Sequence, residues 1–298
     1  MAEPALIPQQ PAGAPPLAIA AGELVVRGVS RGYGAGPERK EVVRDCSFTV
    51  ERGKLSVMIG PSGCGKSTLV RLLAGFERPT AGTVALDGAP ITGPSRDRQV
   101  VFQESALFPW MTTYDNIVYG PRARGDHGEA TRALAETLLE KVGLQGFRDK
   151  YPPQLSGGMQ RRAELARALI NDPKVMILDE PFRGLDALTK ELMWDYCARL
   201  FEESGRTNLF VTTDIDEAVF LADRILIMAN VPTRLRAVLE VDLPRPRKLA
   251  DVAASDRAND IKAEALSLLH EEAMKSFAHG SRAAADFVEA YASRRSPR

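Results

Sequence analysis

The stretch that decides the fold is GPSGCGKST at residues 60–68, which matches the pattern G-x-x-x-x-G-K-S/T. It follows a short apolar run at residues 54–59 and opens a helical pattern at Lys66 that places three leucines on one face. Glycines let the backbone curl so that successive N–H groups point inward, and the helix N-terminus adds its positive dipole end. The stretch therefore predicts a phosphate-binding loop between a strand and a helix.

This loop indicates a site for a nucleoside triphosphate. Lys66 is expected to reach the β- and γ-phosphates, and Ser67 is expected to bind Mg²⁺. A glycine-rich turn without a ligand is the alternative, and the flanking strand and helix argue against it. For the side chain of Cys64 we favour a filler role. The loop residues assigned to the nucleotide are Gly60, Pro61, Ser62, Gly63, Cys64, Gly65, Lys66, Ser67 and Thr68.

The second motif is VMILDEP at residues 175–181, an apolar strand pattern that ends in the acidic residues Asp179 and Glu180. Open α/β sheets bind ligands at the carboxyl ends of their strands, where both acids are expected. Asp179 suits Mg²⁺ binding, and Glu180 suits polarising the water that attacks the γ-phosphate. Solvated turn acids are the alternative, which the long adjoining apolar strand disfavours.

The remaining pattern predicts an α/β fold. Strand-like runs alternate with helical ones on both sides of a helical stretch, which indicates a mostly parallel sheet with an inserted helical subdomain at about residues 104–172. We expect a flexible Pro/Ala-rich tail at residues 1–22 and a main domain at 23–243. Residues 244–298 are expected to form a helical extension, with an amphipathic helix around 261–275 and a basic tail.

Bulk composition sets limits on partners. The 298 residues include 39 basic and 39 acidic side chains, so no global field favours nucleic acid, and we expect no nucleic-acid partner. The three cysteines, Cys46, Cys64 and Cys197, lie far apart and are expected to be reduced thiols. No run of eighteen apolar residues is present, so we expect no membrane-spanning segment.

A third glycine-rich motif, LSGGMQ at residues 155–160, precedes the helical run RRAELARAL. Together with the two motifs above it resembles the signature of ABC ATPases, over about residues 23–241. The resemblance implies a P-loop NTPase cassette with an antiparallel β edge layer and an inserted helical subdomain. It also implies that Ser156, Gly157 and Gly158 bind the γ-phosphate of ATP held by a second ATP-binding subunit, identical or different.

The same resemblance implies further site residues. Tyr33 lies where the family stacks an aromatic ring on adenine, with a structural tyrosine as the alternative. Gln103 matches the glutamine that senses Mg²⁺ and the attacking water, and Asp186 matches the aspartate that couples the two sites. The implied cofactors are ATP and Mg²⁺, and the implied metal ligands are Ser67, Gln103 and Asp179.

Three stretches resemble the nitrate/sulfonate/taurine importer branch: VFQESALFPWMTTYDNIVYG, LDEPFRGLDALT and TDIDEAVFLADRI. The branch implies a separate membrane permease, an extracellular or periplasmic solute-binding protein, and a peripheral position on the cytoplasmic face of the inner membrane. Leu107, Phe108, Pro109 and Trp110 would then be an exposed apolar patch that contacts the permease. The alternative places Phe108 and Trp110 in the core of the helical subdomain.

The chain departs from the family pattern at two positions. Thr213 stands where the family has a histidine that positions the γ-phosphate and the attacking water. A threonine hydroxyl cannot carry a proton as imidazole does, so we predict reduced turnover from a catalytic set of Glu180, Gln103 and Thr213. Arg183 replaces a residue that is usually small in this branch.

Several functions stay open at this point. The chain could power an importer as a slow homodimer, or pair with a different ATPase that does most of the hydrolysis. A regulatory ATP-binding module is a further alternative that Thr213 suggests. A soluble ABC ATPase of DNA repair or translation is disfavoured because such proteins usually carry two cassettes, long coiled coils or zinc insertions, and this chain has neither a second cassette nor sustained heptads or a metal motif.

Overall fold

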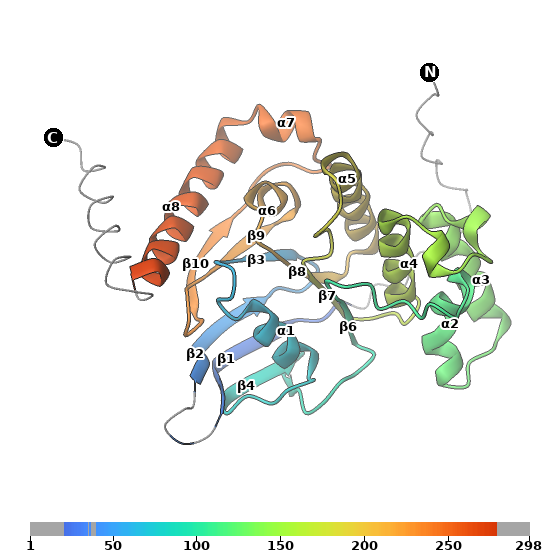
Figure 1. Ribbon diagram of the computed structural model, residues 1–298, viewed down its shortest axis with the longest axis horizontal. Helices are drawn as coiled ribbons and strands as arrows, with labels where there is room; N and C mark the ends of the chain where they lie inside the picture. Colours follow the sequence, from blue (N-terminus) through green and yellow to red (C-terminus); the bar gives the residue numbers. More distant parts are fainter. Residues whose placement is uncertain (1–20, 35, 37–39, 279–298) are drawn as a thin grey trace.

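The computed structural model of the chain describes residues 21–34, 36 and 40–278, and its centre is a sheet of six strands. Neighbouring strands follow the order β10, β9, β3, β8, β7, β6 (Figure 1). The strands from β9 to β6 are parallel, and β10 runs antiparallel to β9 at the edge. The bounds are β3 Leu55–Ile59, β6 Arg98–Val101, β7 Val175–Asp179, β8 Thr207–Thr212, β9 Arg224–Met228 and β10 Leu235–Glu240.

A second, antiparallel sheet lies beside the first, with the strand order β2, β1, β4, β5. Helix α1 (Lys66–Ala74) lies between the two sheets, because Leu69 and Leu73 share one hydrophobic core with Val26 of the small sheet and Met58 of the large one. This arrangement fixes the start of α1 at the end of β3. The bounds of the small sheet are β1 Leu24–Tyr33, β2 Lys40–Val50, β4 Ala81–Leu86 and β5 Ala89–Pro90.

Strand β3 is buried along its whole length because both faces of the large sheet are covered. Successive side chains of a strand point to opposite faces. Accordingly Leu55, Val57 and Ile59 belong to a second core, which includes residues of α5 (Ala187–Ser204) and α6 (Ile215–Leu221) on the face opposite α1. The parallel strands thus bring their carboxyl ends to one edge between two cores.

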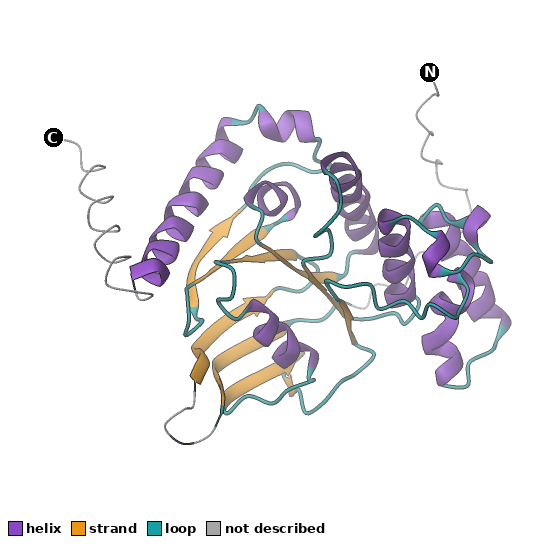
Figure 2. Cartoon of the chain, in the orientation of Figure 1, coloured by secondary structure: helices purple, strands orange, loops and turns teal. Residues whose placement is uncertain are grey.

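A helical subdomain is inserted between β6 and β7 and lies at one end of the molecule (Figures 1 and 2). It contains α2 (Thr113–Ala123), α3 (Glu129–Lys141) and α4 (Gly157–Leu169), with two short 3-10 turns at Gln145–Phe147 and Pro152–Gln154. Buried apolar residues of all three helices join the core formed by α5 and α6, so the subdomain is packed against the large sheet.

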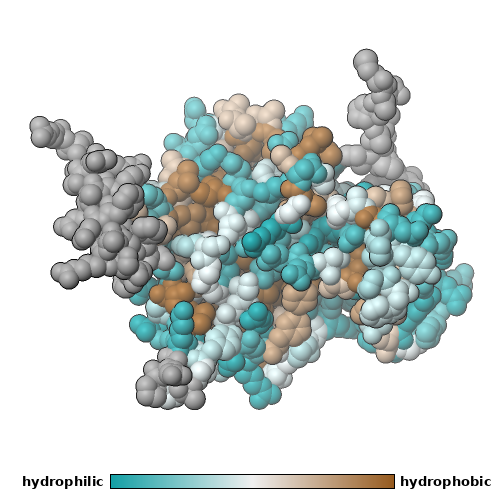
Figure 3. Space-filling model, in the orientation of Figure 1, coloured by the Kyte–Doolittle hydropathy of each residue, from teal (hydrophilic) through white to brown (hydrophobic). Residues whose placement is uncertain are grey.

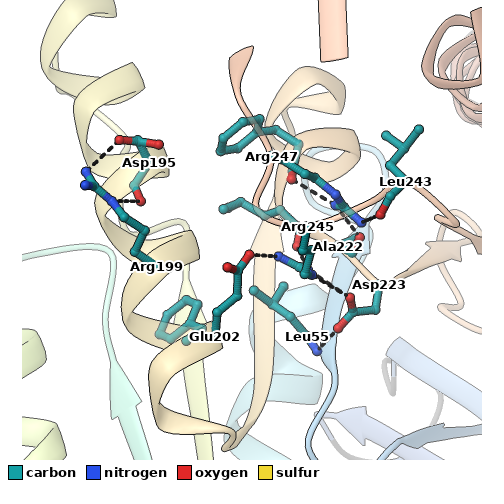
Figure 4. Close-up of polar contacts among 12 residues, drawn as sticks. Leu55, Asp195, Arg199, Glu202, Ala222, Asp223, Leu243, Arg245 and Arg247 are labelled. Carbon is teal, nitrogen blue, oxygen red and sulfur yellow. Dashed lines mark hydrogen bonds and ion pairs between the residues drawn. The ribbon is translucent and has the colours of Figure 1, made fainter. Parts of the chain in front are cut away.

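After β10 the chain forms α7 (Leu249–Ala253) and α8 (Asp256–Ala278), which arch over α6 (Figure 1). Arg245 and Arg247 anchor this part (Figure 4), and Arg245 pairs with Asp223 at 2.9 Å. Burial, with Arg245 nearby, lowers the pKa of Arg247 to about 10. Arg247 donates to the backbone carbonyl oxygens of Val219, Phe220, Ala222, Val241 and Leu243.

The predicted α/β class, with a mostly parallel sheet, an antiparallel β layer and an inserted helical subdomain, is confirmed. Strand β10 was not predicted. The expected division at residues 22 and 244 stays a prediction, and most of the tail at 1–22 and the basic end of the chain lie outside the described residues. Gly22, at the end of the expected tail, donates its N–H to the carbonyl oxygen of Lys174 at 3.2 Å.

Within the described part of the chain, no helix combines the length and apolarity needed to cross a bilayer. On the face shown in Figure 3, apolar residues form several separate patches among hydrophilic ones. Surface apolar residues in scattered groups are usual for a folded domain.

Candidate functional site

The glycine-rich loop lies between β3 and α1, as the sequence predicted. Gly63 and Gly65 adopt positive φ angles of 74° and 110°, so the backbone curls as a phosphate-binding nest requires. A Cβ at Gly65 would lie 2.5 Å from Thr233 Oγ1, so this position also needs a glycine for space. No side chain caps the N-terminus of α1, and no acidic residue lies in its first turn. Its first N–H groups can therefore bind an anion.

Two side chains of this loop have contrasting surroundings. The Nζ atom of Lys66 donates to the carbonyl oxygens of Gly60 and Pro61 at 2.8 and 3.1 Å, which holds the ammonium group over the loop. Cys64 is fully buried in the core shared by α1 and both sheets, and burial raises the pKa of its thiol. The burial of Cys64 is what a filler side chain requires, and the filler role itself stays a prediction.

The end of β7 brings Asp179 to this loop. Burial raises the pKa of Asp179, while a hydrogen bond with the Ser67 hydroxyl opposes this shift. Ser67 itself is exposed at the first turn of α1. A hydroxyl oxygen beside a carboxylate is the kind of hard oxygen donor set that Mg²⁺ prefers, so these two residues fit the ion.

Glu180 follows in a constrained conformation. Its φ of 45° lies in the left-handed region, which costs a non-glycine residue on the order of 1–3 kcal/mol. The backbone N–H of Glu180 donates to Val211 O at 2.8 Å, so the neighbouring strand β8 holds this geometry. The constraint fixes the direction in which the Cα–Cβ bond of Glu180 leaves the sheet. The Glu180 side chain is 17% exposed, and its carboxylate accepts from Arg183 Nη1 at 3.1 Å.

Gln103 follows β6 and is exposed. The buried guanidinium of Arg161 donates to the carbonyl oxygens of Phe102 and Gln103 at 2.6 and 2.8 Å and pairs with Glu164 at 2.6 Å. Glu164 in turn accepts from the N–H of Ala106. Because Arg161 and Glu164 both belong to α4, the backbone around Gln103 is attached to the helix that begins within the LSGGMQ motif.

The LSGGMQ motif and Asp186 lie at the beginnings of two helices. Ser156 caps α4 by accepting from Met159 N–H at 3.3 Å, and Gly157 is exposed at the first turn. Asp186 caps α5 by accepting from Thr189 N–H at 2.9 Å. The two helix starts touch, since a Cβ at Gly158 would lie 3.0 Å from the methyl group of Thr189. Both motifs thus present polar groups at the surface.

Thr213 and Tyr33 are also at the surface. Thr213 follows β8 in the loop before α6 and is exposed. The Tyr33 hydroxyl donates to Glu77 Oε2 at 2.7 Å, and Arg31 lies 4.9 Å from the ring centroid. Tyr33 is 36% exposed, so the ring has accessible surface for a ligand.

The patch predicted at residues 107–110 is only partly present. The expectation that Leu107 is exposed is wrong, because Leu107 is 8% exposed and belongs to the core of the helical subdomain. The alternative that Trp110 is a core residue is wrong as well, since Trp110 is 70% exposed. Phe108 is half-buried and packs on Trp110 and Tyr119 at centroid distances of 5.5 and 4.7 Å.

A groove of about 510 Å³ adjoins this aromatic cluster. It lies between β6 and the helices α2 and α4, and its lining includes Phe102, Phe108 and Tyr119 together with basic side chains. The arginines that line it are Arg96, Arg124 and Arg167. The groove therefore combines aromatic surface with positive charge next to the segment that carries Gln103.

Sequence reasoning missed the buried polar residues that hold these loops. Asn116 of α2 accepts from Phe108 N–H at 2.8 Å and donates to the carbonyl oxygen of Met111 at 3.2 Å. Arg161 and Glu164 could have been suspected, because two charged residues three apart interrupt the apolar face of a helix. No comparable signal identifies Asn116.

Comparisons with known proteins agree with these features. The ABC transporter family model matches residues 43–183. The nitrate import ATP-binding protein of Synechococcus elongatus is 44% identical over 80% of this chain and 86% of its own length. The taurine import ATP-binding protein of Pelagibacter ubique is 44% identical over 70% of this chain and 77% of its own length. The aliphatic sulfonates import ATP-binding protein of Bacillus licheniformis is 41% identical over 75% of this chain and 87% of its own length.

A solved structure is similar as well. It is a dimeric ATP-binding cassette in a post-hydrolysis state with ADP and Pi bound. The TM-score is 0.63 at 27% identity, and the match covers 74% of this chain and 100% of the other.

Proposed function

This chain belongs to the ABC transporter ATP-binding proteins, in the branch of nitrate, sulfonate and taurine importers, and from that premise we propose that it hydrolyses ATP to power solute import through a separate permease. One observation carries the proposal. The phosphate-binding loop, the Ser67–Asp179 pair and the constrained carboxylate of Glu180 meet at the carboxyl edge of β3 and β7. The relatives' names support a small anionic or zwitterionic solute such as nitrate, a sulfonate or taurine.

We assign the nucleotide to the loop at residues 60–68. Its N–H groups and the start of α1 bind the phosphates, and Lys66 turns from the loop carbonyls to the β- and γ-phosphates. Mg²⁺ would be held by Ser67, Asp179 and Gln103 and would supply charge neutralisation at the phosphates. Tyr33 stacks on the adenine ring.

Glu180 is assigned as the group that orients and polarises the attacking water. Its position one residue beyond Asp179 and its fixed backbone support this role, because a catalytic carboxylate must be preorganised. Thr213, on the neighbouring strand end, contributes a hydroxyl in place of imidazole. Arg183 holds one oxygen of Glu180, so we expect it to slow the reaction.

A second ATP-binding subunit is proposed to complete each site. Ser156 caps α4 and is exposed, as is Gly157 at the first position of the helix, while Gly158 behind them is buried. The backbone N–H groups of this helix start can bind the γ-phosphate of ATP on the opposite subunit. Asp186 would connect the two sites. The dimeric state of the similar solved cassette supports this assembly.

The permease is proposed to dock at the groove beside Phe108, Trp110 and Tyr119. An exposed tryptophan next to a pocket that carries arginines fits a partner segment with an apolar face and an acidic or helix C-terminal end. The chain would then be peripheral on the cytoplasmic face of the inner membrane, with a solute-binding protein on the other side.

The test is Mg-ATP turnover by the purified chain and its Glu180→Gln variant, with nucleotide binding followed in parallel. We expect the variant to lose about 10²-fold or more in turnover and to keep its affinity for ATP. Equal turnover in both proteins would contradict the role of Glu180. Tight binding without turnover in either protein would instead support the alternative of a hydrolysis-deficient partner or regulatory subunit.

A further inference from the structure

One face of α5 carries three polar or aromatic residues at a spacing of four. Asp186 caps the helix, and Lys190 and Trp194 follow it one and two turns later. Residues at i, i+4 and i+8 lie above one another on a helix. The Lys190 ammonium lies 5.4 Å from the centroid of the Trp194 indole, which shows that the two side chains are neighbours on this face.

This face holds the segment 212–217, which carries Thr213, at two points. Lys190 Nζ forms an ion pair with the Asp214 carboxylate, one residue beyond Thr213. Trp194 Nε1 donates to Glu217 Oε1 at 2.7 Å in the first turn of α6. Trp194 and Glu217 are 6% and 2% exposed, so their hydrogen bond is shielded from water.

A third contact closes the network around Thr213. Thr212 Oγ1 accepts from the N–H of Asp214 at 3.0 Å, and the Thr212 hydroxyl is hydrogen-bonded to Glu217. Asp214 also caps α6 by accepting from Glu217 N–H at 3.2 Å. Both neighbours of Thr213 in the chain are therefore fixed, directly or through Glu217, to α5, while Thr213 is left exposed.

We propose that Lys190, Trp194 and Glu217 are positioning residues that keep Thr213 in a fixed place relative to Asp186. The inference rests on the proposed ATPase function, and it adds a rigid link between two loops that meet the nucleotide. A movement of the start of α5, where Asp186 meets the second subunit, is transmitted through this link to Thr213. The alternative is that the three residues only stabilise the core.

The experiment measures kcat, KM and ATP binding for Lys190→Met and Trp194→Phe. Lys190→Met removes the ion pair with Asp214 and the cation–π contact with Trp194 but keeps the aliphatic stem. Trp194→Phe removes the hydrogen bond to Glu217 but keeps an aromatic ring. Arg199→Met is the matched control, because Arg199 pairs with Asp195 on another face of the same helix (Figure 4). We expect kcat to fall about tenfold in both variants, with ATP binding and the control unchanged. Lys190→Arg, which keeps the ion pair, is expected to retain most of the wild-type kcat.

A double-mutant cycle separates positioning from stabilisation. If Lys190 acts through Thr213, then Thr213→Ala lowers kcat and Lys190→Met has no further effect in that background. Additive losses, or wild-type kcat in both α5 variants, would overturn the inference while Glu180-dependent turnover still supported the function. Loss of ATP binding together with a lower unfolding temperature would also overturn it in favour of core stabilisation. Wild-type protein without turnover would overturn both proposals.

Discussion

The buried carboxyl of Glu217 should make the stability of this protein depend on pH, and replacing it by glutamine should remove that dependence. Burial is the main cause that raises the pKa of Glu217 from 4.5 to about 7, and hydrogen bonds from Thr212 and Trp194 oppose it only in part. The charge of Lys190 lowers the pKa of Glu217 and the charge of Asp214 raises it, and Cys197 faces Glu217 from α5.

The sign and size of the effect follow from linkage. The folded protein binds the proton of Glu217 more tightly than the unfolded chain does. Its contribution to the free energy of unfolding is therefore fully present below pH 4.5 and is lost as the pH rises through about 7. The difference between the two pKa values corresponds to about 3 kcal/mol at 25 °C, as an order of magnitude.

The assay is denaturant unfolding of the wild type and Glu217→Gln at several pH values across this range. Glutamine keeps an oxygen that accepts from Trp194 but does not titrate. The contributions of all other titrating groups therefore cancel when the free energies of unfolding of the two proteins are subtracted. From the acid to the neutral end of this range, we expect the free energy of unfolding of the variant to rise by about 3 kcal/mol relative to that of the wild type. A difference that stays constant with pH would refute the reasoning.

Glu272 provides a control of opposite sign. Burial raises the pKa of Glu272, but hydrogen bonds from Lys275 and from Asn230 N–H, the latter at 3.0 Å, outweigh it and lower the pKa. Its contribution to stability is therefore present above the ordinary pKa and is lost as the pH falls. Glu272→Gln should lose stability relative to the wild type at neutral pH, and the loss should shrink towards acid.

Three further changes have defined outcomes. Arg183→Gln frees one oxygen of Glu180 and should raise turnover a few-fold, with a weaker dependence on salt than the wild type shows, because the pair is exposed. Thr213→His should raise turnover by about tenfold or more, and an unchanged rate would show that Thr213 is not limiting. Arg247→Met leaves buried carbonyl groups without donors and should lower the free energy of unfolding by about 3 kcal/mol or more, which chemical denaturation would measure.

The parts of the fold that were predictable are those whose signal is local. The phosphate-binding loop, β7 with its two acids and the start of α1 each combine an apolar period with a glycine or charged boundary, and all three were placed correctly. Strand β10 was missed because it is an edge strand with charged residues at two of its six positions, and Leu239 is its one buried residue. A weak period of this kind resembles a loop.

Side-chain exposure depends on contacts that no local pattern contains. Leu107 and Trp110 lie three residues apart in one apolar stretch, yet one is 8% and the other 70% exposed. Asn116 makes the difference, because it binds the backbone at Phe108 and Met111 and turns the chain between them. The identity of the buried residue could therefore be settled only by the packing of α2 against this segment.

The surroundings of Thr213 also depend on contacts between residues that are distant in the chain, which the sequence does not reveal. In the sequence, the loss of a histidine predicts a weaker site. In the structure, both chain neighbours of Thr213 are fixed to α5. Asp214 is bound by Lys190, 24 positions away in the chain, and Thr212 is held through Glu217, which is bound by Trp194, 23 positions away. A short hydroxyl reaches less far than imidazole, so its contribution depends more on the position of the backbone that carries it. A rigid link to α5 is therefore of greater consequence with threonine at this position than it would be with histidine.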